Sequence, residues 1–128
     1  LEEITNKKEI PVLTPMGLNK KKNPYNINAD TASGAVAKAL NSRRLLLMTN
    51  VEGVYDKNKI LMPEITTAEA NRMIDEKIIV SGMIPKINTC IDAVKNGVRG
   101  VVIIDGRKKH SILYEIFSDK GAGTLIRQ

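Results

Sequence analysis

The apolar residues of this chain switch repeatedly between two spacings, which predicts strands and helices in alternation. Short apolar runs of strand length occur at residues 10–15, 44–49, 101–104 and 124–126. Apolar residues spaced by three and four predict helices at 29–40, 66–75, 84–96 and 111–117. Strands that alternate with helices indicate an α/β fold, with a mostly parallel sheet and helices on both faces.

The run at residues 44–49 has no polar residue between Leu45 and Met48. Such a continuous run is typical of a strand covered on both faces, so we expect it to be central in the sheet. The loop that follows, from Asn50 to Tyr55, leaves the carboxyl end of this strand. Ligands of open α/β sheets bind at that end.

Composition indicates a single domain that spans residues 1–128. The chain is 42% apolar with one Phe, three Tyr and no Trp, so its core must be aliphatic. The lone Cys90 excludes an internal disulfide, and with a single His it disfavours zinc. No apolar run reaches membrane-spanning length, so we expect a cytoplasmic protein with no membrane partner.

The net charge of +6 favours anionic partners, a class that includes nucleotides and nucleic acids. The lysine run at residues 20–22 lies beside Asn23-Pro24 and is most simply a solvated hairpin tip. No aromatic residues are interleaved with the basic ones, so we expect no nucleic acid as partner.

Two amides and a carboxylate fall within residues 26–30, where a short extended segment leads into a helix. If the segment is extended, Asn26 and Asn28 point to the same side. Asp30 falls in the first helical turn, where a carboxylate complements the free N–H groups. Helix capping is the simpler interpretation of these residues, and a polar site is the alternative.

Several familiar catalytic signatures are absent. The chain has no P-loop, no complete dinucleotide fingerprint and no Ser-His-Asp set. What remains is Asp30 and Lys86, each near a predicted helix start. Phosphoryl transfer needs positive charge and aligned reactants more than covalent chemistry, and Lys86 could supply that charge. The simpler interpretation of Lys86 is a solvent-facing lysine.

Five motifs occur in order along the chain: NINAD at 26–30, LLLMTNVEGVYD at 45–56, SGMIPK at 81–86, IIDGR at 103–107 and EIFSDKGAGTLI at 115–126. In this order they resemble the C-terminal half of the N-acetylglutamate kinases, which belong to the amino acid kinase family. The resemblance covers residues 10–128. It implies the C-terminal, ATP-binding domain of that fold.

The resemblance also implies a reaction and a set of site residues. The reaction transfers the γ-phosphoryl of ATP to the side-chain carboxylate of N-acetyl-L-glutamate in arginine biosynthesis. It implies that Asn26 and Asn28 bind the substrate, that Asp30 orients catalytic lysines, and that Lys86 stabilises the moving phosphoryl group. Mg²⁺ would arrive with the nucleotide, and no protein metal site is expected. The implied ATP site comprises Thr49, Asn50, Val51, Gly53, Val54, Tyr55, Ile78, Ile79 and Val80.

The chain departs from this pattern in two places. Relatives commonly have Asp where this chain has Asn50, which removes a charge from the nucleotide loop. In arginine-inhibited members the closing segment helps to bind arginine; Glu115 and Gly121 match it, whereas Val102 stands where histidine is frequent. The resemblance thus implies arginine as a possible inhibitor.

The N-terminal substrate domain of the family has no counterpart here. We therefore expect this chain to be an inactive part of a longer enzyme that forms a homo-oligomer. Two other functions remain open: an amino acid kinase for glutamate, aspartate or an aminoadipate derivative, and a non-catalytic module that senses nucleotide or arginine.

Overall fold

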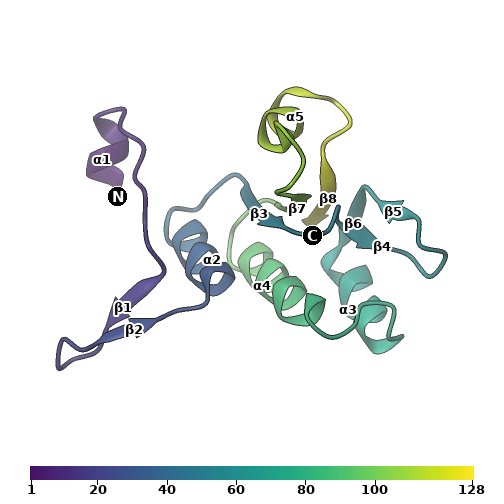
Figure 1. Cartoon of the computed structure of the whole chain (residues 1–128), viewed down its shortest axis with the longest axis horizontal. Helices are drawn as coiled ribbons and strands as arrows, with labels where there is room; N and C mark the ends of the chain where they lie inside the picture. The colour runs from purple at the N-terminus through teal and green to yellow at the C-terminus, as the bar shows by residue number, and fades with distance from the viewer.

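A mixed four-stranded sheet forms the centre of the computed structural model, which describes residues 1–128 (Figure 1). Its strands lie in the order β3 (Leu45–Thr49), β7 (Val101–Asp105), β8 (Gly123–Arg127) and β6 (Glu64–Thr66). β3 is parallel to β7 and β6 is parallel to β8, whereas β7 and β8 are antiparallel. The mostly parallel sheet is therefore confirmed.

Helices cover both faces of this sheet, as the alternation of elements predicts (Figure 1). One face carries α2 (Ala29–Ala39), α3 (Thr67–Asp75) and α4 (Met83–Lys95), and the other carries α5 (Ser111–Phe117). The predicted helices agree with these bounds to within a few residues. No helix is long and apolar enough to span a membrane.

The core lies between the sheet and α4 and is aliphatic. Every residue of β7 is buried, and Ile87 and Cys90 of α4 are fully enclosed against it. Burial raises the pKa of the Cys90 thiol to about 12, so this cysteine stays protonated and packs as a small apolar residue.

The position predicted for the strand at 44–49 is wrong. β3 lies at the edge of the sheet, and Met48 is 47% exposed, so only one face of the strand is well covered. The central place belongs to β7, whose Val and Ile side chains are enclosed on both faces. A continuous apolar run does not distinguish an edge strand from a central one when the edge strand is partly covered by a helix.

An arm of residues 1–28 extends away from the sheet and its helices (Figure 1). It contains α1 (Glu2–Asn6) and a hairpin of β1 (Met16–Leu18) and β2 (Pro24–Asn26), which pairs with no other strand. The strand predicted at 10–15 is not formed, because Pro11 and Pro15 cannot donate and no neighbouring strand is present. The lysine run does lie at the hairpin tip, as expected.

A second hairpin, of β4 (Val54–Tyr55) and β5 (Leu61–Met62), precedes β6 and α3. α3 begins with a capping box. The Thr66 hydroxyl accepts from the N–H of Glu69 at 3.1 Å, and the Glu69 carboxylate accepts from the N–H of Thr66 at 2.8 Å. These bonds satisfy two N–H groups that the helix leaves free.

We expect Thr66→Ala to lower the free energy of unfolding by about 1 kcal/mol, because it removes the hydroxyl that caps α3. Thr66→Ser keeps the hydroxyl and should stay close to the parent. Urea denaturation followed by circular dichroism measures both. An equal loss for Ala and Ser would show that the methyl group, rather than the cap, stabilises this turn.

Candidate functional site

Asp30 and Lys86 form an ion pair although they lie 56 residues apart in sequence. The Lys86 ammonium donates to Asp30 Oδ2 at 2.6 Å, and the two side chains are only 13% and 29% exposed respectively. The interpretation of Lys86 as a solvent-facing residue is therefore wrong. The structure instead joins the two residues that the sequence had identified separately.

Parallel packing of α2 against α4 produces this pair. Three contacts occur in the same order along both helices: Asp30 with Lys86, Gly34 with Thr89, and Lys38 with Asp92. A Cβ on Gly34 would lie 3.0 Å from Thr89 Cγ2, so the glycine permits the close approach. Because the helices run in the same direction, their two N-termini, with free N–H groups, lie at one end beside Lys86.

Asn28 caps α2, and its side chain accepts from the N–H of Thr31 at 3.2 Å. The capping interpretation is thus confirmed for this residue. Asn26 is the last residue of β2 and is exposed, as is Asn28. A role in substrate binding stays a prediction for both residues.

The predicted nucleotide loop leaves the carboxyl end of β3 and is fixed at both ends. The carbonyl of Thr49 accepts from the N–H of Gly106 at 2.8 Å, and the N–H of Val54 donates to Thr124 Oγ1 at 2.8 Å. The Val54 side chain is buried in the core and its N–H is bonded to Thr124, so this residue holds the loop in place.

The second predicted nucleotide segment connects α3 to α4. Ile78 and Ile79 both donate their N–H groups to the carbonyl of Met73, and Ile79 is buried in the core. Val80 is exposed and lies three residues before the first residue of α4. The segment therefore ends at the helix start that carries Lys86.

Charged residues that sequence reasoning did not select surround the nucleotide loop. Glu52 forms an ion pair with Lys108 and accepts a hydrogen bond from the Tyr55 hydroxyl at 3.1 Å. Both contacts, that with Lys108 first, lower the pKa of Glu52. Asp105, at the end of β7, accepts from the side chain and the N–H of Arg107, which lower its pKa to about 2. The register of the parallel strands could have identified Asp105, since it pairs with Thr49.

Glu115 and Gly121, the residues matched to an arginine site, lie together on the α5 face. The buried Glu115 carboxylate accepts from Arg44 Nη1 at 3.1 Å and from the N–H of Ala122 at 2.7 Å. Gly121 has a φ of +68°, and a Cβ there would lie 2.9 Å from Glu115 Oε2. This carboxylate already binds a guanidinium.

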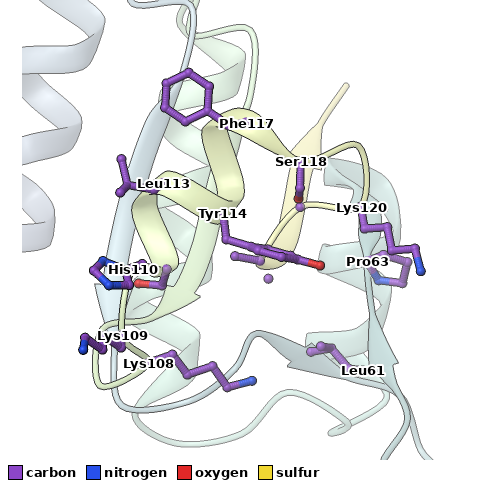
Figure 2. Close-up of a pocket in the computed structure, with 14 residues that line it drawn as sticks. Leu61, Pro63, Lys108, Lys109, His110, Leu113, Tyr114, Phe117, Ser118 and Lys120 are labelled. Carbon is purple, nitrogen blue, oxygen red and sulfur yellow. The ribbon is translucent and has the colours of Figure 1, made fainter.

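A cavity of about 730 Å³ is lined by α5 and by the segment that leads into β8 (Figure 2). Figure 2 shows the Tyr114 ring lying between α5 and the glycine-rich segment before β8. The basic residues around the cavity are Lys108, Lys109, His110 and Lys120. It lies on the α5 face of the sheet, whereas Asp30 and Lys86 lie on α2 and α4 at the other face (Figure 1).

Comparison with known proteins identifies the family of this chain. The model of the amino acid kinase family matches residues 1–105. The chain therefore belongs to the amino acid kinase family.

Similar proteins cover the whole chain but are much longer. Acetylglutamate kinase of Pelagibacter ubique is 53% identical over 128 residues, which are 100% of this chain and 44% of that protein. Acetylglutamate kinase of Methylobacterium nodulans is 49% identical over 128 residues, 42% of its length. The chain thus spans less than half the length of these relatives.

Solved structures agree on the fold. N-acetylglutamate synthase from Neisseria gonorrhoeae, crystallised with coenzyme A and N-acetyl-glutamate, superimposes with a TM-score of 0.94 at 24% identity. The match covers 99% of this chain and 30% of the synthase. At this identity the likeness supports the fold, including the arm, and nothing about the reaction.

A double-mutant cycle on Asp30 and Lys86 should give a coupling energy of about 1–3 kcal/mol in urea denaturation, because the pair is largely shielded from water. The same cycle on Lys38 and Asp92, a more exposed pair between the same helices, should give less than about 1 kcal/mol. Equal coupling in the two pairs would show that the Asp30–Lys86 contact is an ordinary surface ion pair.

Proposed function

We propose that this chain is the nucleotide-binding part of an acetylglutamate kinase, an enzyme that phosphorylates the side-chain carboxylate of N-acetyl-L-glutamate with ATP in arginine biosynthesis. The observation that carries the proposal is the shielded Asp30–Lys86 pair at the joined N-termini of α2 and α4. Relatives named acetylglutamate kinase, about half identical over the full chain, support the choice of substrate.

The geometry suits the transfer of a phosphoryl group. Lys86 is held by Asp30, so its ammonium is in place before a substrate binds, which avoids the reorganisation that charge stabilisation otherwise requires. The free N–H groups at two helix starts add positive potential at the same end. Negative charge that spreads over the oxygens of the moving group would be stabilised there.

The nucleotide would lie between the loop from Thr49 to Tyr55 and the segment Ile78 to Val80. The loop leaves the carboxyl end of β3, and the segment leads directly into the helix that carries Lys86. Asn50 and Val51 lie in the loop itself, where their backbone groups are available to a ligand. Mg²⁺ would arrive bound to the phosphates, and Lys86 would face the γ-phosphoryl.

Acetylglutamate would bind beside Asn26 and Asn28, where the arm joins α2. The arm exposes Ile10, Val12, Leu13, Met16 and Leu18 to solvent. An isolated two-stranded hairpin is marginally stable in water. Both features are expected if the N-terminal substrate domain of a longer enzyme packs on the arm and completes the substrate pocket. We therefore propose that these 128 residues are inactive alone. We also propose, from the family resemblance, that the longer enzyme forms a homo-oligomer.

Arginine would act as an inhibitor at Glu115 and Gly121. The Glu115 carboxylate is buried and already accepts a hydrogen bond from a guanidinium, that of Arg44. The same carboxylate is therefore chemically suited to the guanidinium of free arginine, which would compete with Arg44 for it.

A chimera tests the proposed reaction. In it, this chain replaces the matching 128 residues of Pelagibacter ubique acetylglutamate kinase, to which it is 53% identical. We expect the chimera to form acetylglutamyl phosphate, trapped as its hydroxamate, and the isolated chain to form none. Lys86→Ala in the chimera should lower kcat by about a hundredfold or more, as expected for the loss of a charge that stabilises the transition state.

Lys95→Ala is the matched control, because Lys95 lies exposed at the other end of the same helix. It should leave kcat unchanged. A chimera with full activity in the Lys86→Ala form would contradict the role of Lys86. A chimera that phosphorylates glutamate or aspartate in preference to acetylglutamate would contradict the proposed substrate.

A further inference from the structure

One buried hydroxyl connects the nucleotide loop to the last strand of the sheet. Thr124 of β8 is fully buried, and its Oγ1 accepts from the N–H of Val54 at 2.8 Å and donates to the carbonyl of Met62 at 2.6 Å. Val54 and Met62 face each other on the two strands of the β4–β5 hairpin. A single side chain therefore holds both strands of the hairpin.

Gly53 allows the loop to approach this hydroxyl. A Cβ at position 53 would lie 3.0 Å from the backbone nitrogen of Thr124 and would collide with its Oγ1. Any larger residue at 53 would push the loop away from β8. The Thr124 hydroxyl therefore occupies the space that a side chain at position 53 would need, and the two residues together fix the path of the loop.

The other contacts of the loop are weaker or lie at its edges. Glu52 pairs with Lys108 at the surface, where water screens the charges, so this pair adds little. The bond from Gly106 to Thr49 holds only the end of β3. Beyond these two contacts, Thr124 is the buried polar group that bonds to the loop, at Val54, and determines its course.

We propose that Thr124 is a positioning residue for nucleotide binding, which acts by holding the loop from Asn50 to Tyr55 in its binding conformation. The inference rests on the proposed function, since it assigns Thr124 to the same nucleotide site. Without the hydroxyl, the buried N–H of Val54 and the carbonyl of Met62 lose their partner, and the loop moves to satisfy them elsewhere. Only the fraction of molecules with the loop in place then binds nucleotide, so the apparent affinity falls in proportion.

Calorimetric titration of the intact chain with Mg-ATP tests this inference. Thr124→Val keeps the volume of the side chain and removes the hydroxyl. We expect about tenfold weaker binding, as if the loop were in place in about one tenth of the molecules. Thr124→Ser keeps the hydroxyl and should bind within about twofold of the parent. Ile126→Val, on the same strand and equally buried, controls for a general loss of stability and should not change the affinity.

Gly53→Ala tests the contact from the loop side in case Thr124→Val does not fold. It leaves Thr124 intact but forces the loop away, so it should weaken Mg-ATP binding to a similar extent. Hydrogen exchange of the Val54 amide should accelerate in both variants relative to amides of β7, which a uniform loss of stability would not produce.

Failure of this inference and failure of the proposed function give different results. Parent-like affinity in Thr124→Val and Gly53→Ala, with normal binding by the parent, would overturn the role of Thr124 alone. Absence of Mg-ATP binding by the folded parent would overturn the nucleotide site in this chain and the role of Thr124 with it.

Discussion

The close parallel packing of α2 against α4 is the constraint on which the candidate site depends. It places two helix N-termini at one end of the sheet and brings Asp30 to Lys86. Parallel neighbouring helices carry like charge at each end, so the arrangement is not the one that dipoles favour. Gly34 permits the contact, and the ion pairs at Asp30–Lys86 and Lys38–Asp92 offset part of the repulsion. The unfavourable positive end is also what an anionic substrate needs.

Most of the fold could be predicted from the spacing of apolar residues. The helices at α2 to α5, the capping box at Thr66 and the buried strand β7 follow from local patterns that tertiary contacts reinforce. The edge position of β3 could not be predicted. A partly covered edge strand and a central strand can have the same continuous run of apolar residues. The strand at 10–15 is absent partly because of Pro11 and Pro15, which the sequence shows, and partly because it has no partner strand, which no local pattern reveals.

The sequence predicts residues of the candidate site better than it predicts the contacts between them. Asp30 and Lys86 were identified from their helix starts, but the pair joins residues 56 positions apart and follows from the helix packing. The roles of Thr124 and of the Glu52–Lys108 pair could not be predicted. A threonine in a terminal strand and charges in two separate loops have no local sequence signature. Asn28 shows the opposite case, in which the simple capping role is confirmed and the substrate role stays a prediction.

The most direct test of the central claim is a map of amide chemical-shift changes when Mg-ATP is added to the isotope-labelled chain. The basic cavity and the Lys86 end of α2 and α4 lie on opposite faces of the sheet, and both present positive charge to an anionic ligand. If α2 and α4 form the phosphoryl end of a nucleotide site, the largest changes fall at residues 49–55, 78–80 and around Lys86. Changes confined to residues 108–123, around the basic cavity of Figure 2, would contradict the account.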